Sequence, residues 1–370
     1  MTFVFGILGL GFLVFFHELG HFIAANICGV KVEAFSVGMG PVLLHHQKGD
    51  TDFRLSLIPL GGYCAMKGEQ DFKKALEENK KTIEAQSDSF YGVHPLKRLV
   101  IAFAGPFFNL FFGFLSFFTI ALIGYTYYSA GTVVSMADEV YPELRSAAHI
   151  AGLESGDRIV SINKVAMNDF MEIAGFISSN PDEDLEIVVD RNEKLLEFVV
   201  HSDLDKETGS GKIGIVSDPN SIVQREYERR NFFGAISEGF IQSGKIMAVT
   251  VKSVRVLFKG INISNAVSGP VRITSMLGDT VKEGFGAGIR TGVVSTLEFL
   301  ALLSISLFMT NLLPVPVLDG GLILFAFTEW VTRRKLNPKV LYYIQMVGIA
   351  IIVSMMFLAF FGDILYFIKK

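Results

Sequence analysis

The sequence predicts a polytopic α-helical membrane protein with four transmembrane segments, a membrane-associated β-hairpin and an inserted α+β domain. Half of the 370 residues are hydrophobic, Phe alone accounts for 34, and the mean hydropathy is +0.44. Charged residues make up 19%, below the roughly 25% usual for soluble domains. The net charge of −4 provides no basic field for nucleic acid, so we exclude that class of partner.

The first apolar run, Thr2–Cys28, has about 27 residues, which is long enough to cross a bilayer. It lacks the basic start of a signal peptide. It also carries His17, Glu18 and His21, for which a cleaved leader has no use. We therefore interpret it as a retained transmembrane helix.

The chain after this helix is polar and begins with strand-like sequence. Val32–Leu44 and Phe53–Met66 mix apolar residues with glycines, which predicts a short β-hairpin. Lys67–Ser89 is highly charged and is typical of a solvated helix or a flexible loop.

The second apolar run, Leu99 to about Tyr125, contains no charge and predicts a transmembrane helix. From Ser129 the composition becomes that of a soluble domain of roughly 90 residues. Its strand-like runs are Arg158–Ile162, Leu185–Val189 and Leu195–Val200.

The last part of the chain returns to the membrane. Apolar stretches between residues 222 and 290 are short and interrupted by charges, which favours an amphipathic surface helix or a connector. Two further spans follow, and the basic residues between them, Arg333 to Lys339, place that loop in the cytoplasm. Both termini and the soluble domain are then outside. The predicted division is 1–28 (first span), 29–98 (hairpin and charged loop), 99–128 (second span), 129–220 (soluble domain), 221–292 (connector), 293–332 (third span) and 333–370 (basic loop and fourth span).

The strongest chemical signal is HELGH, residues 17–21. On a helix, His17 and His21 lie one turn apart on one face, so both imidazoles can reach one Zn²⁺. Glu18 would stand beside the open coordination position as a general base. The alternative is a packed or snorkelling polar cluster, but ionisable groups inside a span are costly and are retained mainly for function.

A catalytic zinc needs a third protein ligand. The extended soluble motif does not supply it, because Ala24 and Ile27 occupy the positions of its Gly and its third His. The best candidate is Asp319 in NLLPVPVLDGG, an acid alone in an apolar run that Pro314 and Pro316 interrupt. Such a break could present backbone to a peptide strand. The alternative is a kinked helix with an acid at the membrane interface.

These motifs, together with Gly105-Pro106-Phe-Phe-Asn109 in the second span, occur in the order of the site-2 protease family. Within it, the chain resembles the bacterial regulator of sigma-E protease group over nearly its whole length. The resemblance implies an intramembrane zinc metalloprotease of the cytoplasmic (inner) membrane, with its site near the cytoplasmic side. It makes His17, His21 and Asp319 the zinc ligands and Glu18 the base.

The resemblance also implies roles around the site. Asn109 and Asn311 would help to hold the substrate or the developing oxyanion, although Asn109 could equally be a helix-packing amide. The hairpin would align an extended substrate. The expected partners are transmembrane protein or peptide substrates and the lipid bilayer, and the substrate itself is not named by the sequence.

The soluble insert resembles a PDZ domain through AGLESGDRIVSIN, residues 151–163, in which a glycine turn precedes a strand. PDZ domains bind peptides by adding a strand to a sheet edge, so a peptide or protein ligand is implied. Lys212–Ile215 could be a carboxylate-binding loop or a plain edge strand. The best-known members of the group carry two such modules, whereas one fits here.

Two other functions fit parts of the sequence. A non-catalytic membrane scaffold would keep the PDZ-like insert, but none of the expected catalytic residues is missing. A metal transporter would also place His and Asp in the membrane, but no internal repeat is evident. Cys28 and Cys64 lack the spacing of a structural zinc site and are interpreted as reduced thiols.

Overall fold

The computed structural model describes residues 2–218, 221–256, 259–261 and 268–369. The chain forms two compact units. The first comprises residues 1–123, 230–247 and 269–370, and the second comprises residues 124–229 and 248–268. Each unit is described by itself.

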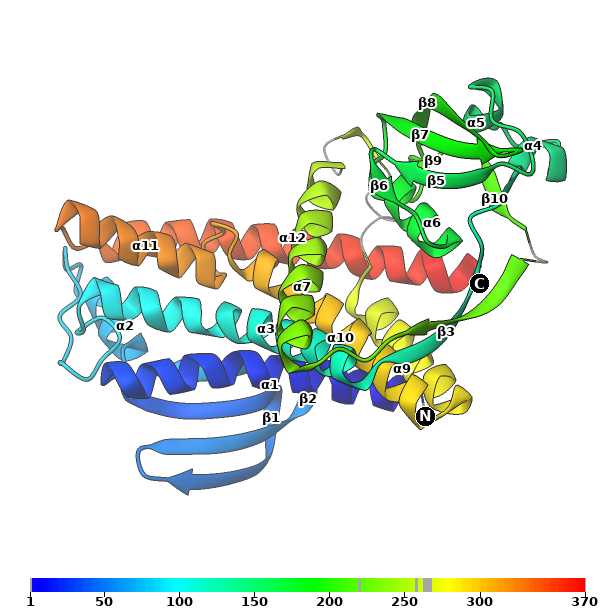
Figure 1. The fold of residues 1–370 in the computed structure, drawn as a ribbon. Coiled ribbons are helices and arrows are strands. Elements are labelled where there is room, and N and C mark those ends of the chain that lie inside the picture. The colour runs from blue at the N-terminus through cyan, green and yellow to red at the C-terminus, as the bar shows by residue number, and fades with distance from the viewer. Residues whose placement is uncertain (1, 219–220, 257–258, 262–267, 370) are drawn as a thin grey trace. The chain divides into compact units, whose positions relative to one another are not determined.

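Four long helices in the described part of the first unit are apolar enough to cross a membrane. They are α1 (Thr2–Cys28), α3 (Pro95–Ile123), α10 (Ile289–Asn311) and α12 (Pro338–Lys369). This confirms the prediction of a polytopic membrane protein. The N-terminus of α1 and the C-terminus of α12 lie at the same end of this helical unit (Figure 1), as four crossings require.

Close packing of α1 against α3 depends on small residues. A Cβ at Gly20 of α1 would collide with the carbonyl oxygen of Ala104 in α3, so glycine lets the two backbones approach. Farther along, Leu13 of α1, Phe112 of α3 and Leu300 of α10 form one apolar cluster. These contacts hold the first two spans in a fixed register.

The third apolar segment is two helices rather than one. Helix α10 ends at Asn311, and α11 (Asp319–Thr332) begins after a non-helical stretch that contains Pro314 and Pro316. Proline lacks the backbone N–H that a helix interior needs, which explains the interruption. The break leaves Asp319 in the first turn of α11.

The predicted connector contains two helices, α7 (Phe232–Val256) and α9 (Pro270–Ala287), and neither meets the criteria for a span. Helix α9 packs against α1, where a Cβ on Gly278 would collide with the backbone of Thr2. Its N-terminus is capped by the buried carboxylate of Asp363 in α12, which accepts hydrogen bonds from the backbone N–H groups of Gly269, Val271 and Arg272.

The predicted short hairpin is a longer structure, made of β1 (Val32–Lys48) and β2 (Thr51–Met66). Residues 34–37 of β1 pair with residues 52–55 of β2 and also with residues 62–65. The first half of β1 is therefore a central strand, and the end of β2 is an outer strand bonded on one side within the described chain. Helix α2 (Glu69–Glu77) follows in the charged stretch.

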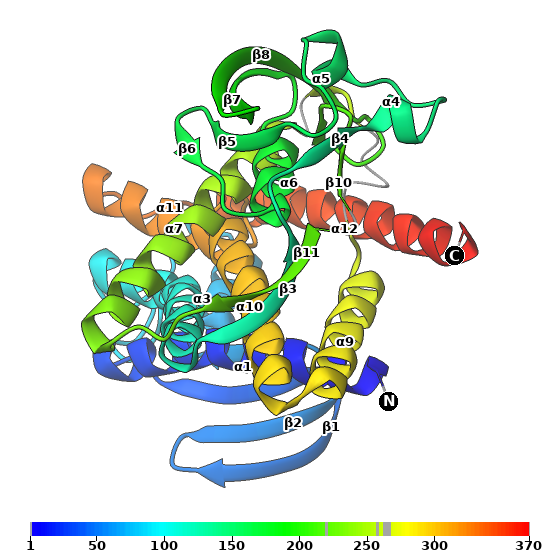
Figure 2. The same cartoon turned by 45° about the vertical axis from the view of Figure 1, so that its right-hand side comes forward.

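The second unit contains a five-stranded sheet in the order β6-β5-β7-β8-β9, with α6 beside it (Figure 2). Its core includes Ile159 and Ile162 of β5, Leu185 of β7, and Ile173 and Ile177 of α6. The bounds are β5 (Arg158–Ile162), β6 (Val165–Ala166), α6 (Phe170–Ser178), β7 (Glu183–Arg191), β8 (Lys194–Leu204) and β9 (Gly211–Lys212).

The second unit is wider than the expected 129–220. Strands β3 (Tyr125–Ala130) and β11 (Ile222–Tyr227) pair as a two-stranded ribbon, which brings both flanks of the insert into it. Lys212 ends β9, whereas Ile215 begins another strand, so the segment from 212 to 215 links two strands. The remaining elements are β4 (Val134–Met136), α4 (Ala137–Val140), α5 (Ala147–Ile150) and β10 (Ile215–Ser217), and β10 pairs with β4.

Candidate metal centre

Helix α1 places two imidazoles on one face, one helical turn apart. The Nε2 atoms of His17 and His21 lie 3.2 Å from each other. His21 is 7% exposed and sits against α3. The HELGH spacing therefore produces a pair of nitrogen donors directed at one point.

Helix α11 brings a carboxylate to the same point. Oδ2 of Asp319 lies 3.2 Å from Nε2 of His17, and Oδ1 lies 3.3 Å from Nε2 of His21. One donor atom from each of the three residues lies within 4.8 Å of the other two. Residues about 300 positions apart in the sequence thus converge, which is the geometry expected of one ion held by three side chains.

The far side of each imidazole also has a partner. Nδ1 of His21 lies 2.9 Å from the carbonyl oxygen of Ile101, to which an Nδ1–H can donate. That tautomer leaves the lone pair of Nε2 free for a metal. Nδ1 of His17 lies 3.0 Å from the side-chain amide of Asn109.

Asn109 is fully buried, and its Oδ1 has no hydrogen-bond partner within the described residues. Oxygen and nitrogen of an amide can exchange places by a half-turn. When Oδ1 of Asn109 is turned toward His17, this oxygen accepts the Nδ1–H of His17. The lone pair on Nε2 of His17 is then free to bind a metal. Asn109 is not among the residues that line the cavity beside the three candidate metal donors. This geometry favours orientation of His17 over the substrate-holding role expected from the sequence.

The spacing of the Gly105–Asn109 motif matches the spacing of the two histidines. Gly105 of α3 faces His21, and a Cβ at this position would collide with the imidazole ring. Asn109, one turn farther along α3, faces His17. Glycine thus provides room for one ring, and asparagine provides a hydrogen bond for the other.

Glycines also shape the start of α11. A Cβ on Gly321 would lie 2.5 Å from the carbonyl oxygen of Val315 and 2.8 Å from Cα of Pro316. Only glycine lets the helix start so close to the preceding proline turn. The two glycines that follow Asp319 therefore fix where its carboxylate points.

Glu18 lies beside the three donors in the wall of a cavity of about 300 Å³. The backbone N–H of Cys64 in β2 is a hydrogen-bond partner of its carboxylate. A Cβ on Gly62 would lie 3.3 Å from Cγ of Glu18, so the outer strand of β2 passes directly against this part of α1. A carboxylate, the three candidate metal donors and a strand edge therefore meet in one cavity.

Asn311, the last residue of α10, also lines this cavity, and its side chain forms no hydrogen bond within the described residues. The sequence did not indicate Tyr63 and Cys64 as cavity residues. Burial, with a contribution from the Glu18 carboxylate, raises the pKa of the Cys64 thiol to about 12, so the thiol is neutral at pH 7. In the sequence, only the position of Cys64 in the predicted hairpin pointed to this part of the molecule.

The donor set fits zinc. Two imidazoles and one carboxylate form a known ligand set for catalytic zinc, which leaves the remaining position open. The hydrogen bonds at both Nδ1 atoms are the kind that orient metal-binding histidines. The carboxylate oxygens of Asp319 meet both Nε2 atoms, as ligands of one ion would.

Comparison with known proteins agrees with this geometry. The family model described as Peptidase family M50 matches residues 5–355. A protein of Treponema pallidum (strain Nichols) is 33% identical, with 98% of each chain covered. A protein of Campylobacter jejuni is 34% identical, with 97% of this chain and 92% of that protein covered. A protein of Helicobacter pylori (strain J99) is also 34% identical, with 98% of this chain and 99% of that protein covered. The names of all three contain the words zinc metalloprotease.

The fold and site define a membrane protein of several spans with a metalloprotease centre. The chain belongs to peptidase family M50, the site-2 protease family. It is a zinc metalloprotease, and Zn²⁺ is its metal.

Proposed function

We propose that this protease hydrolyses peptide bonds within or beside the transmembrane segments of other membrane proteins. The observation that carries the proposal is the position of the donors, because His17 and His21 lie inside an apolar helix long enough to cross a bilayer. A metal site in this helix would lie at the same depth in the membrane as the transmembrane segments of its substrates. Anti-sigma factors and signal-peptide remnants are substrates of this kind.

In this proposal His17, His21 and Asp319 hold the zinc ion. When bound there, zinc would polarise a peptide carbonyl and lower the pKa of a water molecule. Ile101 and Asn109 keep the two imidazoles in the tautomer that presents Nε2. The carboxylate of Asp319 would neutralise part of the positive charge of the zinc ion in these apolar surroundings.

Glu18 is the general base. It shares the cavity with the three ligands, so it can take a proton from the attacking water and deliver it to the leaving amine. The backbone of Cys64 interacts with this carboxylate and would help to orient it. Glu18 therefore serves proton transfer and contributes little to holding the fold.

The outer strand of β2 would bind the substrate backbone. Residues 62–65 bond to β1 on one side, and Gly62, Tyr63 and Cys64 line the cavity. A peptide bond in a transmembrane helix keeps its carbonyl hydrogen-bonded, so the helix must unwind before cleavage. Adding the unwound stretch to this strand edge replaces the lost backbone hydrogen bonds.

Asn311 would bind the freed carbonyl or the developing oxyanion. Its amide lies in the cavity wall, in the same break of α10 and α11 that positions Asp319. Val317 and Leu318, which belong to the same break, line the cavity as well. Non-helical backbone at membrane depth is tolerated where it borders such a cavity.

We place the protein in the cytoplasmic (inner) membrane, with the basic loop at Arg333–Lys339 and the metal site toward the cytoplasm. The second unit would then lie outside and act as a PDZ-like module that binds a peptide or protein ligand. Supporting this, Gly152 and Gly156 have φ near +100°, as tight glycine turns before a strand require. Asp157 is buried and bonded by Arg191, which fixes the start of β5.

The test is cleavage of a model single-span substrate by purified protein with Glu18→Gln. This variant should keep its zinc and lose activity by about 10²–10⁴-fold, the usual contribution of a general base. Glu298→Gln is the matched control, because Glu298 is another carboxylate within a span but does not line the cavity. Near wild-type cleavage by Glu18→Gln would refute the mechanism and favour a scaffold or transporter role.

A further inference from the structure

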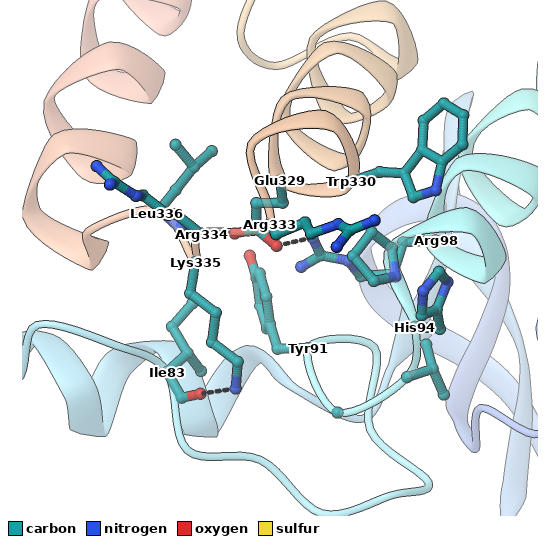
Figure 3. A pocket seen from close by; sticks show the side chains of 13 residues that line it. Ile83, Tyr91, His94, Arg98, Glu329, Trp330, Arg333, Arg334, Lys335 and Leu336 are labelled. Atoms are coloured by element: carbon teal, nitrogen blue, oxygen red, sulfur yellow. Dashed lines mark hydrogen bonds and ion pairs between the residues drawn. The ribbon is translucent and has the colours of Figure 1, made fainter.

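A cavity of about 720 Å³ in the first unit is larger than the cavity at the metal site, and Figure 3 shows the side chains that line it. Its wall is formed where α3 begins, where α11 ends, and where the chain leads into α12. The loop before α3 supplies Ile83, Tyr91 and His94. None of its lining residues lines the metal cavity.

The charge of this cavity is strongly positive. Four basic side chains line it, Arg98, Arg333, Arg334 and Lys335, against the single acid Glu329. Glu329 is already paired with Arg98. The other three basic side chains are exposed and form no ion pair within the described residues. Lys335 donates a 3.4 Å hydrogen bond to the carbonyl oxygen of Ile83, and its charge acts on the carboxylate of Glu84.

Arg98 gives an independent indication of a ligand. It is 5% exposed and lies in the first turns of α3, with its guanidinium 5.8 Å from the ring centres of both Phe90 and Tyr91. Its Nε atom is buried and has no hydrogen-bond partner within the described chain. A buried donor without a partner is costly, so an acceptor supplied by a ligand would relieve it.

The cavity lies at the boundary between membrane and water. The two candidate spans next to it begin at Pro95 and at Pro338, and both of these ends are close to its lining residues. Trp330 lines the wall and is 44% exposed, which is typical of a side chain at head-group depth. The N-terminus of α3 adds a partial positive charge.

We propose that this cavity binds the phosphodiester head group of an anionic phospholipid. Guanidinium groups match the geometry of phosphate oxygens, and two or three of them around one phosphate favour it over a carboxylate. Basic pockets between transmembrane helices on one side of a membrane recognise such head groups. The acyl chains would leave the cavity beside the apolar surfaces of α11 and α12, whose Phe327 and Val340 are exposed.

A bound lipid would join two helices that carry residues of the metal site. Arg98 belongs to α3, which carries Gly105 and Asn109, and Glu329 belongs to α11, which begins at Asp319. The lipid would therefore stabilise the mutual position of α3 and α11. The binding site itself does not depend on the proposed protease substrates.

The chain offers a direct reporter, because Trp330 is its only tryptophan and lines the cavity. Full-length protein in neutral detergent is titrated with short-chain phosphatidylglycerol, short-chain phosphatidylcholine or inorganic phosphate while Trp330 emission is recorded. We expect saturable binding of phosphatidylglycerol and at least about tenfold weaker binding of the other two. Equal responses to both lipids would overturn the proposal, and an equal response to inorganic phosphate would show a free-anion site instead.

Two variants with equal loss of charge separate a site from general attraction. Arg333→Gln with Arg334→Gln and Lys335→Gln should weaken phosphatidylglycerol binding at least about tenfold. Lys48→Gln with Lys73→Gln and Lys81→Gln removes three exposed charges outside the cavity and should leave binding unchanged. Equal weakening in both would refute a defined site. The unfolding midpoint of each variant is measured first, to show that the variant is folded. The comparison of lipids with wild-type protein tests the proposal even if neither variant folds.

Discussion

Replacing Asn109 by leucine tests whether this residue orients a metal ligand or holds the substrate. Leucine has the same number of side-chain heavy atoms as asparagine and the same branch at Cγ, but it is larger and cannot accept the Nδ1–H of His17, whose Nδ1 lies 3.0 Å from the Asn109 amide. Because Asn109 is fully buried, no water replaces the lost partner. A buried donor left unpaired costs about 1–3 kcal/mol.

The loss of this hydrogen bond should also weaken zinc binding, because the unpaired imidazole can rotate or change tautomer. Loss of such an outer partner typically lowers metal affinity about 10–100-fold. The zinc dissociation constant is measured by competition with chelators, and the unfolding midpoint is measured on the same samples. Asn109→Asp should restore zinc affinity, because a carboxylate oxygen also accepts the Nδ1–H.

Asn311→Leu is the control, since it makes the same chemical change within the cavity wall but at a residue without a contact to His17. It should leave zinc affinity unchanged and reduce cleavage. The reasoning is refuted if Asn109→Leu binds zinc as tightly as wild type, or if Asn311→Leu loses zinc and Asn109→Leu does not.

Three further results are expected. Gly105→Val should displace the His21 ring and release zinc, measured by metal analysis, whereas Gly175→Ala, with no atom near the added Cβ, should not. Glu329→Gln should destabilise the protein by about 3–5 kcal/mol in thermal unfolding, because buried Arg98 loses its counter-charge, and Arg98→Met in addition should recover most of the loss. In a cysteine-free background, cysteine at exposed Ser178 should react with an impermeant reagent in intact cells and cysteine at Asn337 should not, and the reverse would invert the proposed topology.

The part of the site that the sequence could indicate is the part encoded by local spacing. His17 and His21 are one helical turn apart, so their common direction follows from helix geometry alone. Asp319 was indicated because an acid in an apolar run needs a partner. The same argument applied to Glu329 would have predicted a partner, but the partner, Arg98, lies 231 residues away.

Other features depend on tertiary contacts that no local pattern specifies. The double pairing of β1 arises because β2 turns back along it, and periodicity predicted only a hairpin. The role of Asp363 as a cap for α9 joins residues more than 90 positions apart. Asn109 was recognised as a motif residue, but its contact with His17 became evident only when α1 and α3 were packed together.

The measurement that tests the central claim most directly is the zinc content of purified Asp319→Asn, compared with wild type and with Glu298→Gln after the same chelator wash. We predict one zinc ion per chain in wild type and in Glu298→Gln, because three donors converge on one point and Glu298 is outside that cavity. Asp319→Asn should lose most of its zinc while keeping its fold. Full zinc occupancy in Asp319→Asn would contradict the proposed ligand set.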